Sequence, residues 1–454
     1  MEPLLSDLFP DADKSAWLMQ VQKELKSTST GNSPYESLRW PTDEGFVVDP
    51  YYTADDLNGL PLETIQAAQK QVPGWLNVPE RQITNERTDG IILRDSINRG
   101  ADALILNLPS SADIDLSWLL NGIKLSDTPV FFKTNHPTAF VESLKTVAPY
   151  QLRGGLLTDP MARWLQSGQP IGADYQTVAD VTKATSDSPQ FRTICASSHL
   201  FHNAGATATQ ELAFLLASLA DQYDHLTNLG LTIEQLVAKT LLSVSVGTHY
   251  FMEIAKLRAL RVLLVRFLTA YESVQSSLFI HCQTSTFYDA AVTPYANLLR
   301  ATTETMAAVL GGCDALTVHP YDTVSGIASD HEFADRIARN ISILLKEESY
   351  LNKVADPAAG SYYLENLTQQ LVESAWALFL EVEKRGGFER AFADGFIPGE
   401  IEQAYQAKVD AIRAGKVLVG VTKFRSDETT NQLNQSSETS ASLLPDRRLA
   451  AEFE

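Results

Sequence analysis

The stretch LSVSVGTHYFMEIAKLRALRVLLVRFLTAYESVQSSLFIHCQTS, residues 242–285, decides the fold class of this chain. It holds two short runs of β-branched and apolar residues, 242–248 and 277–285, separated by the long apolar segment YFMEIAKLRALRVLLVRFLTAYE. Short β-branched runs are typical of buried strands, whereas an apolar segment of this length is typical of a helix. A strand, a helix and a second strand in this order predict one βα unit of a parallel sheet.

The same alternation extends on both sides of this stretch. Eight short apolar runs are separated by helical segments, and they lie at 78–86, 101–108, 129–135, 154–159, 191–198, 242–248, 277–285 and 314–320. Eight βα repeats over about 250 residues are the pattern of a (β/α)8 TIM barrel. A doubly wound open sheet is the alternative, but no GxGxxG follows the first run and no GxxxxGK[ST] occurs anywhere.

The segments outside the repeats define three regions. Residues 1–34 are expected to form an N-terminal helical arm, because Trp17, Val21 and Leu25 follow one another at spacing four. Residues 35–420 are expected to form the barrel with a C-terminal helical extension. Residues 421–454 contain the polar run FRSDETTNQLNQSSETSAS and are expected to be a linker toward an absent C-terminal domain.

Composition excludes several classes of function. The chain has 454 residues with 36 Lys+Arg against 56 Asp+Glu, a net charge of −20 that repels nucleic acid and anionic lipid surfaces. No window approaches the run of apolar residues that a bilayer requires, and the acidic N-terminus does not resemble a signal peptide. Three isolated cysteines indicate a reducing compartment. These features predict a cytoplasmic protein without nucleic-acid or membrane partners.

Histidines at the ends of neighbouring strands are the first candidates for chemistry. Because the carboxyl ends of barrel strands carry the active site, four imidazoles, one from each of four neighbouring strands, could gather round a metal ion. No carboxylate ends a nearby strand in a matching position, and one of these imidazoles could instead face the helices, so the prediction is that no metal is bound. The histidines concerned are His199, His202, His249, His281 and His319.

Two other groups of side chains have a structural interpretation. Cys282 lies mid-strand and no G-x-S-x-G elbow is present, so a covalent hydrolase has little support. Lys256, Arg258 and Arg261 are expected on a helix at the barrel surface, with Lys256 paired to Glu253 three residues before it.

Several long strings carry a resemblance to a known family. VGTHYFMEIAKLRALRVLL, QTS at 283–285, NLLRATTETMAAVLGGCDALTVH, ADRIARNISILLKEES and AGATATQELAF follow the order and wording of the barrel domain of methylmalonyl-CoA mutases. The resemblance covers about residues 35–454. It implies an adenosylcobalamin-dependent isomerase that interconverts methylmalonyl-CoA and succinyl-CoA, with CoA along the barrel axis and cobalamin on a separate C-terminal domain.

Departures from the catalytic pattern of that family occur where the resemblance can be followed. Leu200 stands where a His contacts the thioester, and Ile83 stands where a Tyr reaches the substrate. Leucine cannot transfer a proton. Leu241 and Val292 likewise replace polar groups, and the cobalamin-ligand string D-x-H-x-x-G is absent. The resemblance therefore implies no catalytic residues in this chain, leaving Arg81, His199, Lys239 and Gln283 as substrate-binding candidates.

This combination is similar to the small, or beta, subunit of the heterodimeric mutases, isomerases in which a large subunit carries catalysis and the adenosylcobalamin. The implied partner is that large (alpha) subunit, with no cofactor bound by this chain. The alternative is a catalytic barrel that acts on another acyl-CoA with a separately encoded cobalamin domain, in which His199 or His202 serves as the acid. A third hypothesis, a regulatory binding module, requires an exposed apolar patch.

Overall fold

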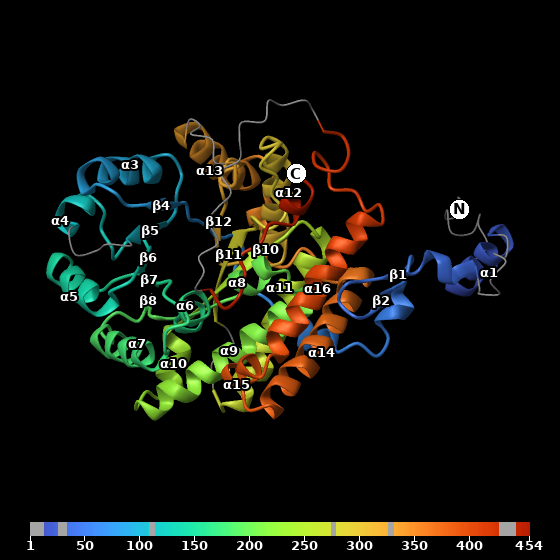
Figure 1. The fold of residues 1–454 in the computed structure, drawn as a ribbon, viewed down its shortest axis with the longest axis horizontal. Helices are drawn as coiled ribbons and strands as arrows, with labels where there is room; N and C mark the ends of the chain where they lie inside the picture. Colours follow the sequence, from blue (N-terminus) through green and yellow to red (C-terminus); the bar gives the residue numbers. More distant parts are fainter. Residues whose placement is uncertain (1–12, 26–33, 109–113, 274–277, 326–330, 426–441) are drawn as a thin grey trace, which may run out of the picture.

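Eight parallel strand segments form the centre of the molecule (Figure 1). The computed structural model describes residues 13–25, 34–108, 114–273, 278–325, 331–425 and 442–454. Two five-stranded sheets have the orders β4-β5-β6-β7-β8 and β3-β12-β11-β10-β9. Their strands are β3 Leu76–Asn77, β4 Glu80–Gln82, β5 Leu104–Leu108, β6 Val130–Thr134, β7 Gly154–Leu156, β8 Phe191–Arg192, β9 Ile194–Ser197, β10 Thr240–Val246, β11 Phe279–Thr284 and β12 Ala315–Thr317.

The two sheets join into one ring through two shared segments. β3 and β4 are separated only by Val78 and Pro79, where Val78 N donates to Leu316 O and Pro79 O accepts from Ile105 N. β8 and β9 are separated only by Thr193, whose N donates to Lys239 O. Strand pairing therefore runs around all eight segments, which confirms the predicted (β/α)8 barrel.

Helices surround the ring, as Figure 1 shows. Those of the barrel are α3 Glu86–Asn98, α4 Leu116–Leu119, α5 Pro137–Val147, α6 Pro160–Ser167, α7 Gly172–Ala184, α8 His199–Ala204, α9 Ala208–Asn228, α10 Ile233–Lys239, α11 Tyr250–Ala270, α12 Ala296–Leu310 and α13 His331–Glu347. The C-terminal extension follows as α14 Tyr362–Lys384, α15 Phe388–Ala393 and α16 Phe396–Arg413. Before the barrel lie α1 Lys14–Glu24, β1 Trp40–Pro41, β2 Val47–Val48 and α2 Leu62–Ala68.

Side chains of the strands alternate between the barrel interior and the helices. On β10, Leu242, Val244 and Val246 pack in the cluster shared with the helices, whereas Leu241 joins the interior cluster. The interior cluster contains Val78, Ala103, Ile105, Phe131, Cys195, Leu241 and Ala315. Because strand side chains repeat every two residues, Ser243 and Ser245 follow Leu241 on the inward face. The interior is thus apolar at one level and polar toward the carboxyl ends.

The C-terminal extension changes the environment of α11. Lys256 and Arg258 are both 0% exposed and Arg261 is 5% exposed. α11 is covered because α14 packs along it, and the Arg258 guanidinium binds Asp356 and Glu365 there. The prediction of a surface helix is therefore wrong, while the predicted Lys256–Glu253 ion pair is confirmed with N···O of 2.6 Å.

Both ends of the described chain make contacts outside the barrel. α1 buries none of its own residues, and its Trp17 ring packs on Tyr35 and Tyr51 at centroid distances of 6.2 and 5.0 Å. Leu444 and Leu449 near the other end are each 3% exposed, so residues 442–454 pack on the folded body rather than forming the expected linker. Most of that expected linker, 426–441, lies outside the described residues. No helix in the described ranges is long and apolar enough to cross a membrane.

Candidate functional site at the carboxyl ends of the strands

A chain of hydrogen-bonded side chains crosses the upper interior of the barrel. His199 Nδ1 lies 2.7 Å from Ser245 Oγ, and His199 Nε2 lies 2.7 Å from Ser243 Oγ. Ser243 Oγ is in turn 2.8 Å from His281 Nδ1, and His281 Nε2 is 2.9 Å from Thr317 Oγ1. The chain runs from His199, just after β9, across β10 and β11 to Thr317 on β12, so His281 faces the interior and not the helices.

The last link fixes the direction of every bond in this chain. Thr317 Oγ1 donates to Val78 O at 2.7 Å, so it must accept from His281 Nε2–H. A neutral imidazole has one N–H, so His281 Nδ1 accepts from the Ser243 hydroxyl. Ser243 Oγ then accepts from His199 Nε2–H, and His199 Nδ1 accepts from Ser245. Both histidines are held as the Nε2–H tautomer.

Burial keeps these imidazoles neutral. Desolvation is the main cause that lowers the pKa of His281 to about 3, with Lys133 and His319 adding repulsion. Desolvation also lowers the pKa of His199 well below its ordinary value. With both ring nitrogens of His199 and of His281 already bonded, neither ring offers a free nitrogen for proton transfer to a ligand.

Removing the Thr317 hydroxyl is expected to destabilise the protein. Thr317→Val keeps the side-chain shape but leaves His281 Nε2–H and Val78 O without partners in a buried site. An unsatisfied buried polar group costs about 1–3 kcal/mol, so the urea midpoint of unfolding should fall accordingly. Thr303→Val, on the exposed face of α12, is the matched control and should change the midpoint little. Equal midpoints for the two variants would contradict the assigned chain.

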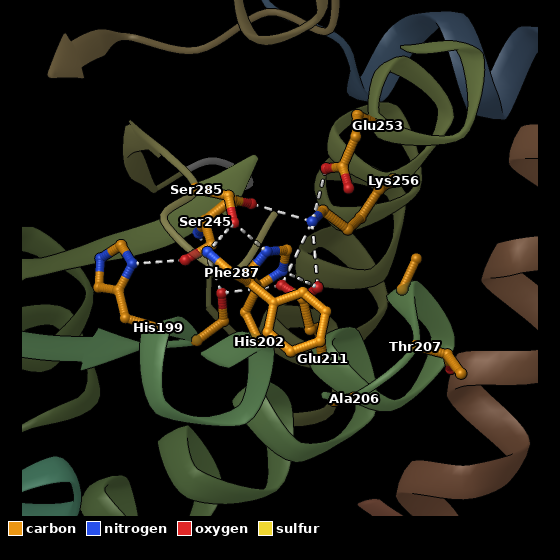
Figure 2. A network of polar contacts seen from close by, with 12 residues as sticks. His199, His202, Ala206, Thr207, Glu211, Ser245, Glu253, Lys256, Ser285 and Phe287 are labelled. Carbon is orange, nitrogen blue, oxygen red and sulfur yellow. Dashed lines mark hydrogen bonds and ion pairs between the residues drawn. The ribbon is translucent and has the colours of Figure 1, made fainter. Parts of the chain in front are cut away.

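A second network lies beside the first, at the start of α9 and α11 (Figure 2). Lys256 Nζ is 2.6 Å from Glu253 Oε2 and 3.2 Å from Glu211 Oε2, and it donates to Ser245 O at 2.9 Å. Burial opposes ionisation of Glu211, but Lys256 and His202 outweigh it and lower the pKa of this carboxyl. His202 Nδ1 donates to Glu211 Oε1 at 2.7 Å. A buried ammonium is therefore shared by two carboxylates.

Ser285, His202 and Glu211 have the order of a hydrolase triad. His202 Nε2 lies 2.7 Å from Ser285 Oγ, on the ring edge opposite Glu211. Ser285 is only 3% exposed, and its Oγ accepts from Phe287 N. Its own N donates to Glu304, so this amide does not point at a substrate oxygen. The arrangement stabilises the loop after β11 and lacks the exposed nucleophile that acyl transfer requires.

The four substrate-binding candidates are not brought together. His199 and Gln283 lie at the carboxyl ends of their strands, where the Gln283 amide contacts His319 Nε2. Lys239 lies at the opposite end of the barrel, where its Nζ donates to the carbonyls of Thr185, Ser188 and Phe191. Arg81 points outward and its Nε binds Asp89 at 2.9 Å.

The two positions where the resemblance implied catalytic side chains also lie away from the interior chain. Ile83 is 3% exposed and packs in the cluster between the first half of the barrel and its helices. Leu200 packs against the larger cluster on the helix side of the other half. No group of three or more His, Cys, Asp or Glu side chains within the described ranges could hold a metal ion.

Sequence reasoning found the histidines of the interior chain but missed its hydroxyl groups. Ser243 and Ser245 occupy alternate positions of LSVSVGT, the spacing that puts both on one face of a strand. That spacing was a usable signal for a polar interior. No local pattern indicated the roles of Thr317 and Glu211, because Val78 and Lys256, which they bind, lie 239 and 45 residues away in the sequence.

The fold and this site define a parallel α/β barrel with a polar carboxyl end. The chain belongs to the methylmalonyl-CoA mutase family, whose family model matches residues 110–448. The methylmalonyl-CoA mutase small subunit of Porphyromonas gingivalis is 33% identical over 86% of this chain and 66% of its own length. That of Streptomyces virginiae is 30% identical over 92% of this chain and 71% of its own length.

Other similarities are broader. Methylmalonyl-CoA mutase of Rhizobium meliloti is 31% identical over 90% of this chain and 63% of its own length. The chain thus spans slightly less than two thirds of the P. gingivalis and R. meliloti proteins, at 66% and 63% of their lengths. A comparison with the structure of dihydropteroate synthase from Thermus thermophilus covers 61% of this chain and 95% of that protein. Its TM-score of 0.30, at 14% identity, is too low to indicate a shared fold.

Proposed function

We propose that this chain is the small subunit of a methylmalonyl-CoA mutase, a non-catalytic barrel that supports a catalytic large subunit. The observation that carries the proposal is the filled interior of the barrel. Phe131 and Phe279 stack across it at a centroid distance of 5.9 Å within the apolar layer. Above them, the inward polar side chains from Ser245 to Thr317 in the hydrogen-bonded chain are bonded to one another. An acyl-CoA along the axis would have to displace both layers.

The side chains at the positions of the family's catalytic groups support the same proposal. Leu200 and Ile83 offer no hydrogen bond, and both pack on the helix side of the strands. His199, the neighbouring imidazole, is held by Ser243 and Ser245. No group in this set is placed to donate a proton to a thioester, as an acid catalyst must.

Adenosylcobalamin, the cofactor implied by the family, finds no free imidazole among the three histidines of the two networks. A protein ligand to cobalt needs an imidazole nitrogen that is free. Both ring nitrogens of His199, His202 and His281 are engaged by neighbouring side chains. We therefore assign both the cofactor and the chemical steps of the reaction to the partner subunit. A cytoplasmic heterodimer with the large subunit completes the proposal.

The purified chain is expected to be inactive alone. With adenosylcobalamin supplied, it should neither convert methylmalonyl-CoA to succinyl-CoA nor release heat on titration with a panel of acyl-CoA esters. Leu200→His should stay inactive, because the side chain at this position packs against the helix-side cluster rather than the barrel axis. Mixing with a large subunit should give a stable heterodimer on gel filtration. Turnover by the lone chain, or tight binding of any acyl-CoA, would favour the catalytic alternative.

A further inference from the structure

A cavity of about 130 Å³ lies outside the barrel axis, between the carboxyl ends of the strands and the segments that cover them. Its wall combines the β1–β2 hairpin, the starts of α9 and α11, the loop after β11, and α16. An engineered cavity of about 150 Å³ accommodates benzene, so a cavity of this size fits a small organic molecule. Carboxyl-end loops are also where barrels of this class bind ligands.

Three side chains that line this cavity converge on Gly247, the residue before the lining residue Thr248. A Cβ at Gly247 would lie 3.1 Å from Tyr288 Cε2, 3.2 Å from His202 Cε1 and 3.3 Å from Glu253 Oε1. Glycine therefore leaves room for these groups to face one shared space. The lining residues Met252, Ile412, Leu418 and Leu449 add an apolar wall.

Glu253 presents an unsatisfied carboxylate oxygen to that space. The residue is 5% exposed, and its Oε2 is the atom paired with Lys256. Its Oε1 takes no hydrogen bond from any residue in the described ranges, and in Figure 2 only one Glu253 oxygen carries a dashed line. This oxygen faces the cavity, so it is free to accept a hydrogen bond from a ligand there.

The charges around the cavity select the sign of the ligand. Its wall holds the carboxylates of Asp43, Glu44, Glu211 and Glu253 against the ammonium groups of Lys408 and Lys416, with Lys256 beneath. The backbone amides at the start of α9 and the Lys408 ammonium, which would attract an anion, are already engaged. Glu44 binds the amides of Ala208 and Thr209 at the start of α9. Lys408 donates to the carbonyls of Gly205 and Ala206.

We propose that this cavity binds a small primary amine in its ammonium form, with the N–H groups directed at Glu253 Oε1 and a short alkyl body against Met252 and Leu418. The Tyr288 ring also lines the cavity, and the face of an aromatic ring attracts a cation. Burial, reinforced by Glu253, raises the pKa of Tyr288, so its hydroxyl stays protonated. This site is separate from the acyl-CoA chemistry of the family and does not depend on the proposed function.

The test uses n-propylammonium as the probe and saturation-transfer NMR on the full chain. Propan-1-ol and propionate are the neutral and anionic isosteres. We expect propylammonium to bind at least five-fold more tightly than either isostere, and Glu253→Gln to weaken it at least five-fold. The exposed acid Glu332 provides the control variant Glu332→Gln, which should bind like the parent.

Each other outcome overturns the proposal. Equal binding of propylammonium and propan-1-ol would show an apolar cavity without selection for charge. Binding that survives Glu253→Gln would place the amine elsewhere, and no binding by any probe would mean that water alone satisfies Glu253. Glu253→Gln removes one carboxylate from Lys256 but leaves its pair with Glu211, so its melting temperature, measured alongside, should fall less than that of Lys256→Met, and binding is measured well below it.

Discussion

Replacing Lys256 by methionine is expected to destabilise the protein more than any other single change described above. The ammonium is 0% exposed and is shared by Glu211 and Glu253, which are themselves buried. Burial opposes its charge, but the two carboxylates outweigh burial and raise the pKa of Lys256. Methionine fills a similar volume, yet both carboxylates lose their counter-ion in a low-dielectric site. Breaking a buried ion pair in this way costs about 3–5 kcal/mol.

The control for this prediction lies on the same helix. Arg266 pairs with Glu373 at the surface, with 34% and 55% of the two side chains exposed. Exposed pairs contribute less than about 1 kcal/mol, so Arg266→Met should shift the urea midpoint little. Adding Glu211→Gln and Glu253→Gln to Lys256→Met should recover part of the loss, since no buried charge is then left unpaired. If Lys256→Met and Arg266→Met cost the same, the network is not a stabilising element.

Acid is expected to destabilise the barrel through its interior histidines. Desolvation first, then charge repulsion from Lys133, lowers the pKa of His281 from 6.5 to about 3 in the folded protein. Desolvation likewise lowers the pKa of His319 to about 4. Between these values and 6.5 the unfolded chain binds more protons than the folded one. The contribution of the neutral histidines to the free energy of unfolding is therefore complete above pH 6.5, and it is lost as the pH falls toward the folded pKa.

The size of this effect follows from linkage. Each histidine should remove up to about 1.4 kcal/mol of unfolding free energy for each pH unit below 6.5. Buried acids with a raised pKa act in the opposite direction; burial raises the pKa of Asp289 to about 7. The measurement is therefore the difference between the parent and His281→Gln in urea unfolding from pH 7 to about 4. The two curves should converge as the pH falls, whereas parallel curves would contradict the prediction.

Much of the architecture could be predicted from local pattern. The runs at 242–248 and 277–285 became β10 and β11, and the segment between them became α11. Hydrophobic period and β-branched content act within a few residues, so a single sequence displays them. The exposure of α11 could not be predicted in this way, because α14 covers it from about a hundred residues further along the chain.

The candidate site likewise has features that the sequence predicts and features that depend on the tertiary structure. The sequence by itself determined the order of eight βα units and the family resemblance, from which Leu200 and Ile83 are expected to stand in place of a histidine and a tyrosine. Only the tertiary structure decided that Lys239 and Arg81 serve local contacts and that Thr317 sets the tautomers of two histidines. Hydrogen bonds and ion pairs depend on distances of a few ångströms between strands, and those distances exist only once the barrel has closed.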